Sequence, residues 1–316
     1  MTLLPAAEAI DRFSADLDAL IGDHPGGVGL AVSGGADSLA LLLLGHAALA
    51  GRVRAATVDH ELRPGAADEA AFVATVSARL GVEHDILRPA EPIVGNIQSS
   101  ARRARYSLLE EWRLAHRLDW LVTAHHADDQ AETLLMRLNR GSGVGGLSAI
   151  RAVNGVILRP LLGWRRAELE AIVSQAGIEP VDDPSNRDER FDRVRMRRQL
   201  AQADWIEPLG LARSAAALAE AEEALNWATE RFWDQRSTST KGSVQLDLDE
   251  VPPELRRRLV YRALQTLRPG LEVRGGDLSR FISALETGGC STLAGVKGEG
   301  ALPWRFTLAP ERRVRS

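Results

Sequence analysis

Short apolar runs alternate with longer, mixed segments over roughly the first 200 residues of the chain. The short runs predict buried strands, and the longer segments, whose apolar residues recur at helical spacing, predict helices. Strands are expected at 28–32, 52–58, 82–87, 120–124 and 156–158. Helices are expected at 1–21, 39–50, 66–80, 99–117, 128–138, 165–176 and 189–200. Because alternating strands and helices form right-handed β-α-β units, the pattern predicts a mostly parallel sheet with helices on both faces.

From about residue 209 onward, long helical patterns replace this alternation. Helices are expected at 212–232, 254–267 and 277–286, a polar loop at 235–243, and two short strands within 291–308. We therefore expect two domains, an α/β domain over 1–208 and a smaller, mainly helical domain over 209–316.

Bulk properties narrow the class of protein. The 316 residues carry a net charge of -4, so contact with nucleic acid would have to come from local basic patches. The single cysteine, Cys290, excludes a disulfide framework and a Cys-x-x-Cys metal site. No apolar run approaches the ~18 residues of a membrane span, and the acidic N-terminal helix is unlike a signal peptide. A cytoplasmic protein without membrane contact is expected.

A small-residue loop, Ser33-Gly34-Gly35-Ala36-Asp37-Ser38, joins the first strand to the next helix. Free backbone N–H groups and the positive end of a helix dipole meet at such a junction and favour an anion. The two glycines allow close approach of a phosphate, and the two serines add hydroxyl donors. The loop is no Walker A motif, because no Gly-Lys-Ser/Thr follows. We interpret it as a phosphate site.

Asp37 is unexpected in such a loop, because its carboxylate would repel a phosphate unless a cation lay between them. Mg²⁺, which prefers oxygen ligands, is the obvious candidate. The alternative is that Asp37 or Ser38 only caps the helix. In parallel sheets, ligands bind beyond the carboxyl ends of the strands, where the loop, 59–60 and 125–126 all emerge. The topology alone therefore brings three candidate segments together.

Three further stretches carry charged residues at helical spacing. Asp129 and Glu132 share one helix face, and Asp128 lies at the helix start. Two alternatives to a role in substrate binding are a transition-metal site with the two preceding histidines and a solvated acidic face. Arg102 and Arg105 share a face that suits a phosphate or carboxylate, although a solvated basic face is the alternative. Residues 187–198 hold six arginines and three acids, a local charge of +3. That helix suits a polynucleotide, unless its charges pair within the helix.

Together these motifs resemble those of the tRNA(Ile)-lysidine synthetases, a family of N-type ATP pyrophosphatases with a Rossmann-like, parallel-sheet domain. The matching segments are 33–38, 59–63, 101–102, 105–106, 123–133, 140–147, 159–162 and 183–186. Within them, 141–146 also matches GxGxxG, but it follows a helix and not a strand, which excludes a dinucleotide site. Val194 stands where the family pattern has asparagine.

The resemblance implies that ATP adenylates the C2 oxygen of the wobble cytidine in a CAU-anticodon tRNA(Ile). The ε-amine of L-lysine then attacks C2, leaving lysidine and releasing AMP. The ATP-binding residues implied are Ser33, Gly34, Gly35, Ala36, Asp37, Ser38, Val58, His60 and His125, with Mg²⁺ at Asp37. For lysine they are Asp129, Glu132 and Arg105, and for tRNA they are Arg102, Arg193, Arg195 and Arg197. Asp129 is favoured as the acceptor of the amine proton; Asp128 and Arg105 complete the catalytic set.

Other functions fit these residues less well. A tRNA thiolase of the same superfamily would need catalytic cysteines in the synthetic domain, and Cys290 lies outside it. An ammonia-using synthetase would need a glutaminase domain, which the chain lacks. A non-catalytic nucleotide-binding RNA module would not need the four acids Asp37, Asp128, Asp129 and Glu132. The sequence leaves the oligomeric state open, with a homodimer among the options.

Overall fold

The computed structural model describes residues 3–22, 26–62, 65–91, 97–182, 190 and 192–310. The motif at 183–186, together with Arg63 and Arg187, lies outside these residues. The chain forms two compact units, Met1–Ala219 and Glu220–Ser316. The division falls within helix α9 (Pro208–Arg236), somewhat beyond the boundary at 208/209 that the sequence suggested.

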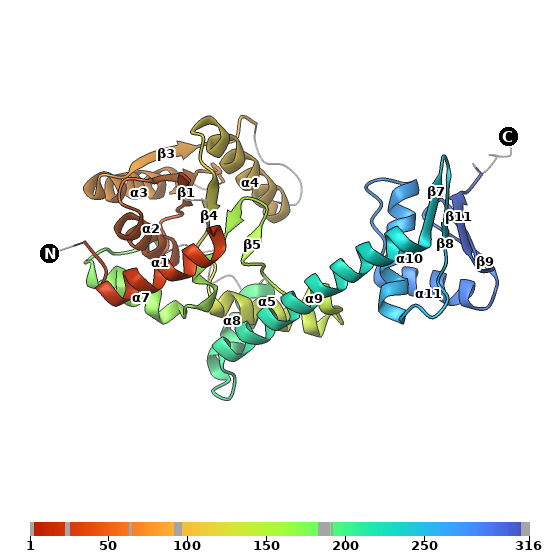
Figure 1. Ribbon diagram of the computed structural model, residues 1–316. Helices are drawn as coiled ribbons and strands as arrows, with labels where there is room; N and C mark the ends of the chain where they lie inside the picture. Colours follow the sequence, from red (N-terminus) through yellow and green to blue (C-terminus); the bar gives the residue numbers. More distant parts are fainter. Residues whose placement is uncertain are drawn as a thin grey trace. The chain divides into compact units, whose positions relative to one another are not determined.

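A six-stranded sheet with the order β3-β2-β1-β4-β6-β5 forms the centre of the first unit (Figure 1). Its strands are β1 (Val28–Ala31), β2 (Val53–Val58), β3 (Glu83–Leu87), β4 (Trp120–Val122), β5 (Val153–Asn154) and β6 (Ile157–Leu158). All neighbouring pairs are parallel except β5 with β6. The predicted, mostly parallel sheet is therefore confirmed.

Helices cover both faces of this sheet. Alternate strand residues enter two different cores: Leu30 lies with helices α1 and α2, whereas Ala31 lies with Leu109 and Trp112 of α4. Period-two alternation along each strand produces this division. The helices are α1 (Ala7–Ile21), α2 (Ala36–Leu49), α3 (Ala66–Leu80), α4 (Ile97–Ala115), α5 (Ala127–Asn139), α6 (Val144–Leu147), α7 (Arg166–Gln175) and α8 (Asp192–Gln202), with the 3₁₀ helix η1 (Pro160–Gly163).

The second unit combines helices with a five-stranded antiparallel sheet of order β7-β8-β11-β10-β9. The elements after α9 are β7 (Ser237–Thr240), β8 (Ser243–Leu246), α10 (Pro253–Leu267), α11 (Gly275–Glu286), β9 (Cys290–Leu293), β10 (Val296–Glu299) and β11 (Trp304–Leu308). The polar loop predicted at 235–243 is wrong, because β7 lies there. An edge strand with one neighbour needs no apolar alternation, and its Ser and Thr residues are mostly exposed. No helix among the described residues is long and apolar enough to cross a membrane.

Candidate active site

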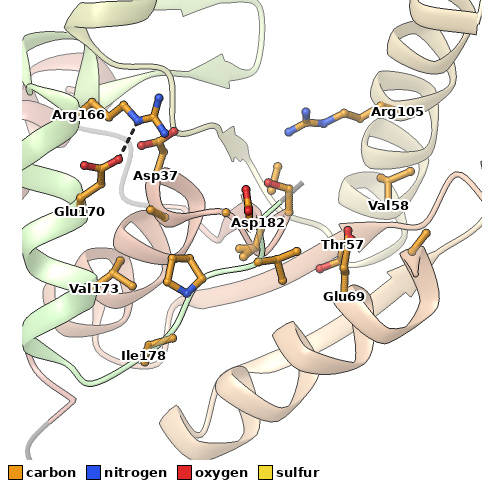
Figure 2. Close-up of a pocket in the computed structure, with 18 of the residues that line it drawn as sticks. Asp37, Thr57, Val58, Glu69, Arg105, Arg166, Glu170, Val173, Ile178 and Asp182 are labelled. Atoms are coloured by element: carbon orange, nitrogen blue, oxygen red, sulfur yellow. Dashed lines mark hydrogen bonds and ion pairs between the residues drawn. The ribbon is translucent and has the colours of Figure 1, made fainter. Parts of the chain in front are cut away.

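A cavity of about 1340 Å³ opens at the carboxyl ends of β1 and β2 (Figure 2). Its volume exceeds the ~300–1,000 Å³ of most small-molecule sites, so it has room for a nucleotide and part of a second substrate. The phosphate loop contributes Ser33, Gly35, Ala36 and Asp37 to its wall, and β2 contributes Thr57 and Val58. Figure 2 shows Arg105 of α4 and Arg166 of α7 on opposite sides of this space.

The loop between β1 and α2 is held open by its own hydrogen bonds. The Ser38 hydroxyl accepts from the Ser33 amide at 3.0 Å and donates to the Gly35 carbonyl at 2.9 Å. Gly34 has φ +86°, a value that favours glycine, and a Cβ there would lie 3.1 Å from Val181. A Cβ at Gly35 would meet only the Ser33 hydroxyl, at 4.0 Å. The loop therefore presents bare backbone to the cavity at the N-terminus of α2.

His126, which is only 1% exposed, lies among three carboxylates. Its Nε2 is 3.5 Å from both Asp37 and Asp129, and its Nδ1 is 3.6 Å from Asp128. Burial lowers the pKa of His126, but the hydrogen bonds to Asp128 and Asp37 and the charge of Asp129 outweigh it and raise the pKa to about 10. The Asp129 amide lies 3.4 Å from Nδ1, and the Asp129 carboxylate accepts from the His126 amide at 3.2 Å, so the two residues form a capping box at the start of α5. The imidazolium partly neutralises these acids.

Among the residues that the structure describes, one oxygen of Asp37, the buried Oδ1, has no hydrogen-bond partner. Asp37 lies in the first turn of α2 and lines the cavity. A buried carboxylate oxygen without a donor is costly unless a cation or water satisfies it. Asp37 therefore fits a divalent cation on the phosphate side of the cavity. Among the described residues, no group of three His, Cys, Asp or Glu side chains forms a site of its own for a metal.

The Asp128 carboxylate is hydrogen-bonded to residues at the start of α7. Arg165 donates to it through Nε and Nη2, at 3.2 and 3.0 Å, and the Arg166 amide donates at 2.8 Å. Burial alone would raise the pKa of Asp128, but the hydrogen bonds from His126, Arg165 and the Arg166 amide hold it well below its usual range. Asp128 therefore anchors the start of α7 and does not line the cavity.

Asp129 and Glu132 of α5 are paired with arginines of α8. Glu132, only 2% exposed, accepts from Arg193 Nε at 2.8 Å and from Arg197 Nε at 2.6 Å. Asp129 accepts from Arg193 Nη2 at 2.9 Å. The acids predicted to bind lysine and the arginines predicted to bind tRNA therefore lie together and pair with one another.

Arg105 and His60 face the cavity with unused hydrogen-bonding groups. Within the described residues Arg105 has no hydrogen-bond acceptor or ion-pair partner, and His60 Nδ1 is buried without a partner. Burial and the Arg105 charge lower the pKa of His60. These two residues line the cavity with Val58, whereas His125 does not. His125 Nδ1 lies 2.8 Å from Thr123 Oγ1, and burial, together with Arg159 and Arg105, lowers its pKa to about 3.

The remaining residues predicted to bind tRNA are exposed. Arg102 stacks over the Tyr106 ring at 5.1 Å, and Arg195 pairs with Asp192 of its own helix. Val194, the departure from the family pattern, lines the cavity. Sequence reasoning missed the wall made by α7, whose residues Arg166, Glu170 and Val173 share one helix face. Their spacing was the available signal, but an Arg–Glu pair four apart is a common feature of exposed helices.

Comparisons with known proteins now decide the family. A PP-loop domain family model matches residues 7–204. The tRNA(Ile)-lysidine synthase of Novosphingobium aromaticivorans is 48% identical over 313 residues, covering 96% of this chain and 95% of the relative. The chain belongs to the tRNA(Ile)-lysidine synthase family. The Zymomonas mobilis member is 46% identical over 297 residues, 91% of this chain and 90% of its own length.

Solved structures agree with this family at the level of the fold. A U34-tRNA thiolase from Methanococcus maripaludis, with a [4Fe-4S] cluster, superposes with a TM-score of 0.56 at 16% identity. The match covers 68% of this chain and 80% of the thiolase. At this identity the match shows only that the two proteins share the fold. The evidence for the family is the 46–48% sequence identity to tRNA(Ile)-lysidine synthases.

Proposed function

We propose that this protein joins L-lysine to C2 of the wobble cytidine in a CAU-anticodon tRNA(Ile), using ATP and releasing AMP and pyrophosphate. One observation carries the proposal: tRNA(Ile)-lysidine synthases match it over nearly their whole length and its own. The alternatives of a thiolase or a non-catalytic RNA module have no comparable support.

The first half-reaction joins the cytidine C2 oxygen to the α-phosphorus of ATP and breaks the bond to the β-phosphate oxygen. The phosphate loop offers the amides at the start of α2 to the departing pyrophosphate. The unpaired Oδ1 of Asp37 is suited to Mg²⁺, which would neutralise phosphate charge when bound. Val58 and His60 are suited to the base, where the free Nδ1 of His60 provides a polar contact.

In the second half-reaction the lysine nitrogen forms a bond to C2, the C2–O bond breaks, and AMP leaves with the electron pair. We assign the cationic groups of lysine to Asp129 and Glu132, where they would replace the guanidinium groups of Arg193 and Arg197. Arg105, which has no hydrogen-bond acceptor or ion-pair partner within the described residues, suits the lysine carboxylate. The attacking amine must lose a proton, and Asp129 is the proposed acceptor, with Asp128 positioning the helix that carries it.

For tRNA we propose contacts through the exposed Arg102 and Arg195, and through Arg193 and Arg197 once their acids have another partner. A cytoplasmic location follows from this substrate, and a homodimer remains a compatible assembly. These assignments explain why basic side chains are needed locally on a protein of net charge -4.

The deciding experiment is incorporation of [¹⁴C]lysine into a CAU-anticodon tRNA(Ile) transcript by the purified protein with ATP and Mg²⁺. We expect one lysine per tRNA and one AMP per lysine. The control is initiator tRNA, which has the same anticodon and should remain unlabelled. ADP as the product, or label in both tRNAs, would contradict the proposal.

A further inference from the structure

One face of helix α7 forms a wall of the cavity that the reaction described above leaves without a role. Arg166, Glu170, Val173, Ser174 and Gly177 all line the cavity, and their spacing places them on one side of the helix and the turn that follows it. Figure 2 shows Arg166 and Glu170 joined at the cavity wall, where Arg166 Nε donates to Glu170 Oε1 at 2.9 Å.

Helix stability does not account for Arg166. It is the first residue of α7, where the positive end of the helix dipole disfavours a cation. Its pair with Glu170 has the arginine first, which is the weaker order, and the two side chains are 40% and 50% exposed. Such a pair adds little to stability, so exchanging Glu170 for a stronger anion costs little.

The backbone of Arg166, by contrast, is fixed relative to the phosphate loop. Its amide donates to Asp128 at 2.8 Å, Asp128 lies 3.6 Å from His126, and His126 lies 3.5 Å from Asp37. This chain of contacts ends on the carboxylate at the N-terminus of α2. A firmly held backbone with a weakly held guanidinium is the arrangement expected of a residue that changes partner during a reaction.

We propose that Arg166 is a catalytic residue that leaves Glu170 to bind the β- and γ-phosphates of ATP and the pyrophosphate formed from them. The proposal rests on the ATP-dependent reaction proposed above. When the bond to the α-phosphorus breaks, the electron pair stays on pyrophosphate, whose charge a bidentate guanidinium stabilises. Glu170 holds the arginine between turnovers.

Calorimetric titration of the purified full-length protein with Mg·pyrophosphate and, separately, with AMP tests this assignment. Arg166→Gln should weaken Mg·pyrophosphate by roughly 10- to 100-fold, the range for a charge-assisted contact, and leave AMP unchanged. Arg166→Lys should recover part of the loss. Glu170→Gln should bind Mg·pyrophosphate at least as tightly as the natural protein, because it releases the arginine.

Arg12→Gln is the matched control. Arg12 of α1 is 41% exposed and pairs with Glu168 of α7, the helix that also carries Arg166. It does not line the cavity. Unchanged pyrophosphate affinity in Arg166→Gln, or equal losses in Arg166→Gln and Glu170→Gln, would overturn the proposal. Thermal unfolding of each variant identifies one that fails to fold. Because these titrations need no tRNA or lysine, their outcome is separate from that of the lysine-incorporation assay.

Discussion

Charge, and not apolar burial, holds helix α8 against helix α5 of the same unit. The structure describes all of α8, and none of its residues is buried. In its contacts with α5, Arg193 and Arg197 pair with the buried Glu132. Just after α5, Arg140 Nη2 lies 3.3 Å from Asp192 Oδ2. We therefore predict that Glu132→Gln, which keeps the side-chain size and removes the charge, loosens α8 from α5.

The size of this effect follows from burial. Removing one partner of a buried ion pair costs about 3–5 kcal/mol, because the other charge stays unpaired. Here the charges left behind are not buried, since the Arg193 and Arg197 side chains are 42% and 32% exposed and can regain water. We expect the lower range of about 1–3 kcal/mol, which makes local opening of α8 roughly 5- to 150-fold more frequent.

Amide hydrogen exchange measured by mass spectrometry checks this prediction. Peptides covering α8 should exchange faster in Glu132→Gln, whereas peptides of α2, which lies in the main core, should not change. Arg195→Gln is the control, because Arg195 pairs with Asp192 of its own helix, whereas the ion pairs to Glu132 come from Arg193 and Arg197. Saturating lysine should also speed α8 exchange in the natural protein if it takes Glu132 from the arginines.

Equal exchange of α8 in the natural protein and in Glu132→Gln would refute the reasoning, because the ion pairs would then not hold the helix. Equal acceleration in Glu132→Gln and Arg195→Gln would also refute it, since the effect would not depend on α5. A global fall in stability, with α2 exchanging faster as well, would mean that Glu132 supports the whole core and not one helix.

Three other predictions follow from the site. Asp37→Asn should reduce pyrophosphate release from ATP by at least about 100-fold and leave lysine binding by calorimetry unchanged, because the lost charge serves the phosphates. Burial holds the pKa of His125 at about 3 in the folded protein, against 6.5 in the unfolded chain. Its contribution to the free energy of unfolding is therefore complete above pH 6.5 and is smaller by about 2 kcal/mol at pH 5. Urea unfolding of His125→Asn should lack this part of the pH dependence. Arg195→Gln should weaken tRNA binding and lower the salt slope by about 0.7–0.9 in filter-binding titrations.

The architecture of the first unit could be predicted because its signals are local and repeated. An apolar strand at 28–31, a glycine turn at 34–35 and an apolar helix from 36 each have a direct sequence signature. The strand β7 could not be found in this way, since its Ser and Thr residues pair only with β8 at the sheet edge. The wall formed by α7 was also invisible, because helical spacing shows which residues share a face but not what that face meets.

Charged side chains were the hardest to assign, because sequence shows their sign and not their partners. Asp129 and Glu132 suggested a cationic ligand and Arg193 and Arg197 an anionic one, yet these residues, more than sixty positions apart, neutralise each other. The groups of the cavity wall that lack a hydrogen-bond partner within the described residues are more informative, and they include Asp37 Oδ1 by the phosphate loop and Arg105 across the cavity. Burying polar groups without partners costs free energy, and a fold keeps them where a ligand repays that cost. A metal-bound triphosphate at Asp37 and a carboxylate at Arg105 would satisfy both, so the unpaired groups favour the proposed pair of substrates independently of the family match.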